Sequence, residues 1–84
     1  MPPEDVQKKL QARPFKRFRM HLSDGTMYDV IHAELVLLGR RSLVLGLASR
    51  PEETVYERTV DIDLLHIVRM EQTEGAARPG NGQS

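Results

Sequence analysis

The chain has 84 residues, and its 12 Lys and Arg are balanced by 12 Asp and Glu, so the formal net charge is zero at neutral pH. This length provides for one domain, without room for a second core. The neutral balance excludes a basic field over the whole molecule, of the kind that binds nucleic acid strongly. The absence of cysteine excludes disulfides, thiolate metal sites and a cysteine nucleophile.

The distribution of charge is uneven along the chain. Residues 1–42 carry eight Lys and Arg against five Asp and Glu, whereas residues 43–84 carry four against seven. This modest asymmetry indicates either cross-strand pairing inside the fold or head-to-tail association of protomers. No apolar run approaches the roughly 18 residues of a membrane span, and residues 1–5 do not resemble a secretory signal. We therefore expect a cytoplasmic protein with no membrane partner.

The N-terminal segment predicts a short helix that starts at Pro3 and is ended by the pair Arg13-Pro14, because a residue before proline avoids the helical region. Val6 and Leu10 are one turn apart and form a narrow apolar stripe. We expect this stripe, together with Phe15, to dock on the rest of the fold. The polar positions should face water, among them Lys8, Lys9 and Gln11.

Residues 18–30 predict the β-hairpin around which the fold is built. Apolar and polar residues alternate before Asp24-Gly25, a strong hairpin signal. A two-residue loop would set Met20 opposite Asp29, among apolar side chains. A three-residue loop at 23–25 instead sets Met20 opposite Tyr28 and collects the apolar groups on one face. We therefore predict the longer loop, with Gly25 in the left-handed region.

Two strands of this hairpin, at 16–22 and 26–31, are followed by a helical turn at 32–34 and a short strand. A tight turn at Gly39-Arg40-Arg41 leads to a strand at 42–47. Its core side should carry Leu43, Leu45 and Leu47, while Gly46 on the other side predicts a bulge or a bend.

The second half of the chain begins with a polar loop at 48–54. A strand at 55–62 follows, with Tyr56, Val60 and Ile62 inward, and Arg58 at the mouth of the fold or at a bulge. A helical turn at 63–66 then precedes the last strand, at 67–71.

These elements predict a mainly β fold, a small five-stranded barrel that is closed or partly open. Residues 1–71 form this single domain with its short N-terminal helix. Residues 72–84 contain no large apolar side chain and are predicted to be a disordered tail.

Three segments carry a resemblance to a group of small bacterial proteins of unassigned function. They are residues 14–25 (PFKRFRMHLSDG), 39–42 (GRRS) and 64–71 (LLHIVRME). The resemblance extends over most of residues 4–71 and implies a shared fold but no activity.

The turn Leu22-Ser23-Asp24-Gly25 also resembles that of Sm-like proteins, the Hfq type included. The likeness implies a bent five-stranded barrel behind an N-terminal helix. Val30 stands where that family bends at a glycine, and Val36 and Arg40 stand near its RNA-binding Asp and Asn. The uridine pocket therefore does not carry over, and an SH3-like barrel explains the same pattern equally well.

Catalytic and metal sites are weakly signalled. The chain has three histidines, His21, His32 and His66. They would bind zinc only if the fold gathered them, and their spacing matches no ligand motif. We interpret them as partly exposed strand and turn residues. The sequence has no Gly-rich phosphate loop and no nucleophile elbow, so we predict neither an enzyme nor a cofactor.

The best candidate site is a basic strand face next to a turn. Parity places Arg17, Arg19 and His21 on the outer face of the first strand. The tentative nucleic-acid-binding residues are Lys16, Arg17, Arg19, Arg40 and Arg41, with Arg13 close in sequence. No aromatic platform accompanies them. The alternative is a solvated face, balanced by Glu52, Glu53, Glu57 and Asp61.

Two functions are consistent with this sequence. The first is a small non-enzymatic binding or assembly module, expected to form homo-oligomers through exposed strand edges. The second is Sm-like binding of RNA or single-stranded DNA through the basic face. The ligand, the partner and the pathway are not encoded in any motif of the chain.

Overall fold

The computed structural model describes residues 1–73. In this range the chain forms one α-helix, six strands and two short 3-10 helices. In chain order they are α1 (Pro3–Gln11), β1 (Phe18–Leu22), β2 (Met27–Val30), η1 (Ala33–Leu35), β3 (Val36–Leu38), β4 (Ser42–Leu47), β5 (Arg58–Asp63), η2 (Leu64–His66) and β6 (Ile67–Gln72).

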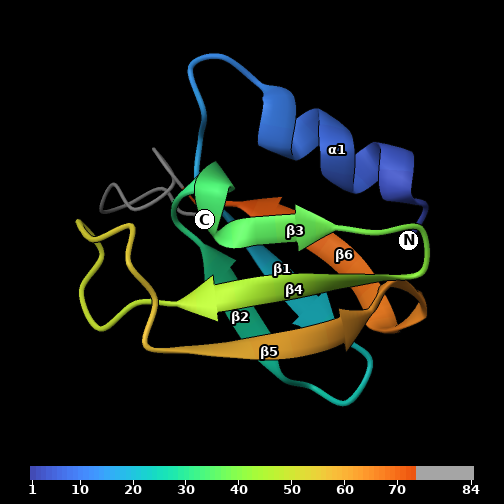
Figure 1. The fold of residues 1–84 in the computed structure, drawn as a ribbon. Helices are drawn as coiled ribbons and strands as arrows, with labels where there is room; N and C mark the ends of the chain where they lie inside the picture. The colour runs from blue at the N-terminus through green and yellow to red at the C-terminus, as the bar shows by residue number, and fades with distance from the viewer. Residues whose placement is uncertain (74–84) are drawn as a thin grey trace, which may run out of the picture.

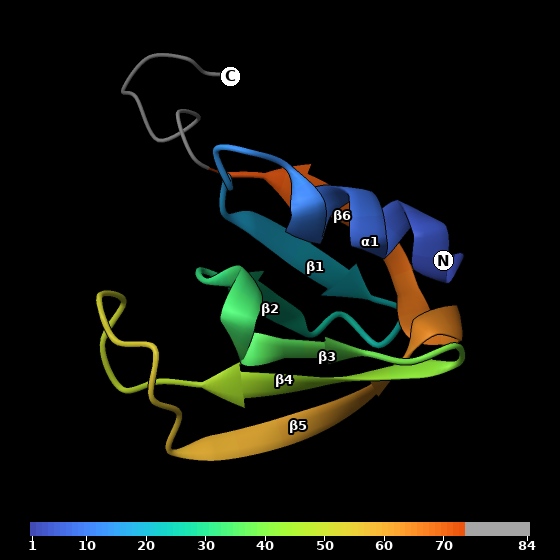
Figure 2. The same cartoon turned by 45° about the horizontal axis from the view of Figure 1, so that its top comes forward.

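The strands form two antiparallel sheets of three strands each, ordered β2-β1-β6 and β3-β4-β5. In Figures 1 and 2, α1 and β5 lie on opposite sides of the molecule. The mainly β prediction is confirmed, but within residues 1–73 the strands number six and form no single closed sheet, in place of the five-stranded barrel. All the predicted strand segments are present, but β2 and β3, which η1 separates in the chain, belong to different sheets.

The hairpin has the predicted register. Phe18 pairs with Val30 and Met20 with Tyr28, and Gly25 has a φ of +89° in the turn. The Asp24 carboxylate accepts a hydrogen bond of 2.9 Å from the backbone N–H of Thr26, which stabilises the three-residue loop. This bond is the main reason that the pKa of Asp24 lies below its ordinary value.

The core lies between the two sheets and under α1. Fully burying a side chain as large as that of Phe18 stabilises the fold by about 1.5–3 kcal/mol relative to leaving it exposed. The predicted inward sides of β1 and β4 are confirmed. The buried residues are Val6, Phe18, Met20, Val30, Leu43, Leu45, Ile62, Leu64 and Ile67.

Helix α1 docks on the sheets through the predicted stripe. Val6 is fully buried, and Leu10 and Phe15 are partly buried against the core. The Phe15 and Phe18 rings meet edge to face, with centroids 6.2 Å apart. The helix ends at Gln11, ahead of the predicted stop, and Arg13-Pro14 lies in the linker to β1. No helix within residues 1–73 is long and apolar enough to cross a membrane.

The predicted inward position of Tyr56 was wrong, and the residue lies on the outer side of β4. Tyr56 was expected in the core but is 57% exposed, because β5 starts only at Arg58 and the strand parity does not extend back to Tyr56. Gly46 makes no bulge, since the β4–β5 register is continuous. Its missing Cβ instead makes room for the Tyr56 side chain, whose Cβ lies 2.9 Å from where a Cβ at position 46 would be.

The end of the domain also differs slightly from the prediction. The two helical turns are present as η1 and η2, with the Asp63 carboxylate accepting from Leu65 N–H at the start of η2. Strand β6 runs through Gln72, and Thr73 N–H donates to Arg17 C=O at 3.3 Å. Residues 72 and 73 therefore belong to the fold, and the rest of the predicted tail lies outside the described residues.

Candidate binding groove

The outer face of β1 does not present its cations to a ligand. Arg19 lies opposite Asp29 on β2, and its guanidinium donates to both carboxylate oxygens, at 2.7 Å and 3.3 Å. This two-pronged pair is the main reason that the pKa of Arg19 is raised, and it occupies two of the five N–H donors of the guanidinium and offsets its charge.

His21 is also paired across strands. Its Nε2 lies 2.9 Å from a carboxylate oxygen of Glu71, with an Arg69 nitrogen 3.4 Å away. The bond from His21 is the first cause that lowers the pKa of Glu71, and the positive charges of Arg69 and Arg19 also lower it. The acids that balance this face are therefore Asp29 and Glu71, not the four that the sequence suggested.

The five tentative nucleic-acid-binding residues are not brought together. Lys16 and Arg17 lie in the linker before β1, and Arg40 and Arg41 lie in the turn between β3 and β4. Figures 1 and 2 place this linker and this turn at opposite ends of the molecule, with α1 running between them. Arg40 and Arg41 instead border a separate hollow of about 620 Å³ beside the N-terminus and η2.

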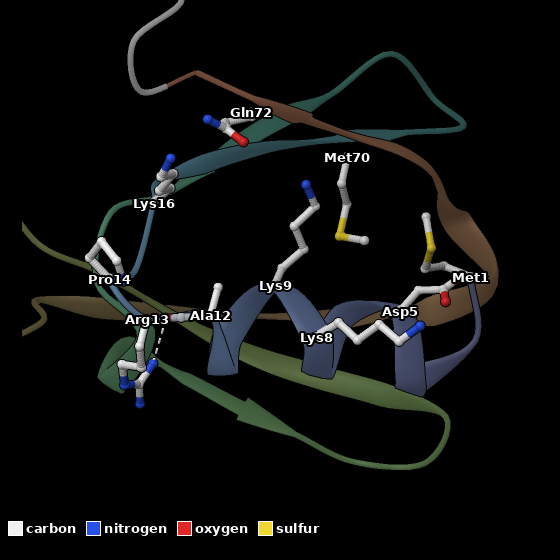
Figure 3. Close-up of a pocket in the computed structure, with 10 residues that line it drawn as sticks. All are labelled: Met1, Asp5, Lys8, Lys9, Ala12, Arg13, Pro14, Lys16, Met70 and Gln72. Carbon is white, nitrogen blue, oxygen red and sulfur yellow. Dashed lines mark hydrogen bonds between the residues drawn. The ribbon is translucent and has the colours of Figure 1, made fainter.

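The largest concentration of cations lies in a groove of about 730 Å³ between α1, the linker and β6, drawn in Figure 3. The lining is basic at the rim and partly apolar below it, with one carboxylate, that of Asp5. Its cationic residues are Lys8, Lys9, Arg13 and Lys16, and the others are Met1, Ala12, Pro14, Met70 and Gln72. We refer to this feature as the α1–β6 groove.

The three lysines of the α1–β6 groove differ from its arginine. Arg13 donates to the carbonyl oxygens of Leu10 and Ala12 at the end of α1, where a cation favours the helix dipole. The lysines have no ion-pair partner within residues 1–73. Figure 3 shows Lys9 and Met70 extending toward one another across the groove.

An open strand edge borders the groove. Among the strands of residues 1–73, β6 ends its sheet and pairs only with β1. The bond from Thr73 N–H to Arg17 C=O shows which residue pairs of this antiparallel ladder are hydrogen-bonded. Alternate residues bond to β1, so Arg69 and Glu71 point their backbone groups toward β1 and Met70 points them away. Met70 thus directs an N–H and a C=O to the open side of β6, away from β1, and Met70 is one of the residues that line the groove.

The histidines lie apart, each with its own neighbour. His66 Nδ1 lies 3.0 Å from the Ser23 hydroxyl, and His32 Nε2 donates to the Pro51 carbonyl at 2.6 Å. Within residues 1–73, no group of three or more His, Asp or Glu side chains is placed to hold a metal ion.

Sequence reasoning found part of this site. It singled out Arg13 and Lys16, but it read Lys8 and Lys9 as solvated positions of the helix. Their closeness to Arg13 and Lys16 in the sequence carried a usable signal, because it places four cations within nine residues. Met70 could not be found, because only the fold brings β6 beside α1.

Comparison with protein families, with curated proteins and with solved structures finds no match to this chain.

Proposed function

We propose that the protein is a non-enzymatic binding module whose α1–β6 groove takes an extended acidic segment of polypeptide. The observation that carries the proposal is the position, beside the open edge of β6, of three lysines that have no ion-pair partner within residues 1–73. A peptide strand added to that edge would bond with the backbone of Met70, while its carboxylates lie near Lys8, Lys9 and Lys16. This is strand addition, in which main-chain bonds give affinity and side chains give specificity.

A peptide suits the groove better than a nucleic acid does. Single-stranded nucleic acid is held by phosphate contacts together with aromatic platforms. The groove offers cations but no aromatic side chain among its lining residues. Backbone N–H and C=O groups on a strand edge find matching partners in another polypeptide and not in a sugar–phosphate chain.

The finer description of the fold is part of the proposal. Two small sheets with an N-terminal helix and a 3-10 turn before the last strand are compatible with an SH3-like or Sm-like barrel. Small barrels of this kind commonly use strand edges and clefts between elements for binding, which agrees with a groove beside β6. An experimental structure in which β2 and β3 join as one bent strand would support this assignment.

Fluorescence anisotropy with three labelled probes tests the proposal. The probes are a twelve-residue peptide of alternating Glu and Val, the same peptide with Lys for Glu, and a twelve-nucleotide oligo-U. We expect the Glu peptide alone to bind in the micromolar range at 150 mM salt. Tighter binding of oligo-U than of the Glu peptide would replace this proposal with the nucleic-acid alternative.

A pair of charge-matched variants locates the binding. Lys8→Glu/Lys9→Glu reverses two charges in the groove, and Arg40→Glu/Arg41→Glu reverses two charges away from it. The groove variant should bind the Glu peptide at least tenfold more weakly, a loss of about 1.4 kcal/mol in binding free energy. The turn variant should stay within about twofold, since distant exposed charges are largely screened. Equal losses in the two variants would show that only net charge matters and would contradict the proposal.

Self-association through strand edges is the second candidate function. It is favoured by β5, which also ends its sheet and carries Asp61 and Asp63, opposite in sign to the groove. Light scattering with size exclusion tests it from micromolar to millimolar protein. A dimer or larger ring that Asp61→Pro dissociates would support it, because proline removes an edge N–H. A monomer at every concentration would exclude it and leave the peptide-binding proposal standing.

A further inference from the structure

The outer face of the sheet β3-β4-β5 carries an apolar platform that the groove does not use. Outward positions alternate along each strand, and Leu37 lies opposite Val44 in the register of β3 and β4. Leu37 is 73% exposed and Tyr56, beside them over Gly46, is 57% exposed. Three apolar side chains thus lie together on a face that the rest of residues 1–73 leaves uncovered.

Tyr56 is held in place on this platform. The side chain lies against the backbone of Gly46, where any Cβ would approach the Tyr56 Cβ and ring carbons to 2.9–3.2 Å. Glycine within a strand weakens it relative to residues with side chains, yet β4 has glycine at the position under the ring. A ring that already packs against β4 on one side has less conformational entropy to lose when a partner covers its other side.

The charges on this face have one sign. Asp61 lies opposite Val44 and Asp63 opposite Ser42. The outward positions of the three strands are Leu37, Ser42, Val44, Gly46, Thr59, Asp61 and Asp63. None of these residues is Lys or Arg. The outer face of β1 differs, because there the cation of Arg19 pairs with the carboxylate of Asp29.

This pattern selects among possible occupants. The same face of a second copy would bring like charges together, and phosphates would be repelled by Asp61 and Asp63. We propose that the outer face of β3-β4-β5 docks a basic polypeptide segment that bears aliphatic residues and an arginine. The aliphatic residues cover Leu37 and Val44, and the arginine stacks on Tyr56 while its guanidinium pairs with Asp61. Aromatic rings with a neighbouring carboxylate suit arginine better than lysine.

Chemical-shift mapping with synthetic peptides on the full chain tests this docking surface. Three sixteen-residue amphipathic peptides share their leucines and differ only in carrying Arg, Gln or Glu at the polar positions. We expect the Arg peptide to shift the amides of Leu37, Val44 and Asp61. It should bind at least fivefold more tightly than the Gln peptide, and the Glu peptide should not bind.

Two variants of the exposed ring make the test specific. Tyr56→Ala should weaken the Arg peptide about three- to tenfold, and Tyr56→Phe should leave its affinity nearly unchanged, because the ring and not the hydroxyl is used. The side chain of Tyr56 is exposed, so an unchanged Tm in both variants would show that the fold is intact. The proposal is overturned by equal binding of the Arg and Gln peptides, by shifts elsewhere, by no binding, or by full affinity in Tyr56→Ala.

Discussion

Cations gather in two regions of this molecule, the outer face of β1 and the α1–β6 groove, and within residues 1–73 the two regions differ in how these cations are paired. On β1, Arg19 faces Asp29 and His21 faces Glu71 at hydrogen-bonding distance. In the groove, Lys8, Lys9 and Lys16 have no ion-pair partner within residues 1–73.

The difference has a structural cause. Within a sheet, the register puts a fixed neighbour about 5 Å from each side chain, so that a charge is readily neutralised by the adjoining strand. The groove lies where a helix, a linker and a strand edge meet, and no register pairs their side chains. Charges that are free to meet a partner are therefore expected at such junctions in this fold.

The largest expected effect separates the two faces of β1. Phe18→Ala removes a fully buried ring and should lower the free energy of unfolding by about 3–5 kcal/mol. Arg19→Ala, one residue along on the outer face, should cost less than about 1 kcal/mol. Urea denaturation followed by circular dichroism measures both, and similar midpoints for the two variants would contradict the assigned faces.

The second effect compares single cations of the two regions. Lys9→Glu should weaken binding of the acidic peptide about fivefold, a loss of about 1 kcal/mol in binding free energy. Arg19→Glu changes the charge equally but should leave the affinity within about twofold, because Arg19 lies outside the groove lining. Anisotropy titrations at one salt concentration decide the matter, and the reverse order would assign the site to the strand face.

The third effect measures the pairing on β1 itself. A double-mutant cycle with Arg19→Ala and Asp29→Ala should give a coupling free energy of about 0.2–1 kcal/mol, the range for exposed pairs. The side chains are 38% and 43% exposed, so the coupling should shrink when the salt is raised to 1 M. A coupling of zero at low salt would mean that the pair is not formed in solution.

The smallest effect is a pH dependence from Glu71. Its pKa in the folded protein lies below the ordinary 4.5, chiefly because of the bond from His21. The carboxylate therefore adds stability above pH 4.5, and this stability is lost as the pH falls through the lower folded value. Urea midpoints between pH 6 and pH 3 should fall more steeply for the native chain than for Glu71→Gln. Parallel curves would contradict the His21–Glu71 bond.

Local sequence sufficed for the hairpin. Alternation in β1 and the Asp-Gly signal leave one register that segregates the apolar side chains, and the structure has it. Tyr56 was assigned wrongly because parity was extended back past the start of β5. A pattern of alternation does not mark where a strand begins, so the ring was counted as core although it lies outside on Gly46.

The sites depended on contacts between distant segments. Glu71 lies 50 residues after His21 in the chain and yet pairs with it on the outer face of β1. A single sequence contains no signal for that pairing. The groove needs both α1 and β6, so that only its Arg13 and Lys16 were found from the local run of basic residues. The helical turn before β3 was predicted, but the division into two sheets depends on which strands pair with one another, and this pairing is tertiary.

Amide hydrogen exchange at Met70 tests peptide binding at the open edge of β6. We expect the Met70 N–H to exchange rapidly in the free protein, while those of Arg69 and Glu71, which point toward β1, are protected. Saturation with the Glu–Val peptide should slow exchange at Met70 by tenfold or more and leave its two neighbours unchanged. A Met70 amide that is already protected in the free protein, or that is unaffected by saturating peptide, would show that no peptide strand adds to this edge of β6.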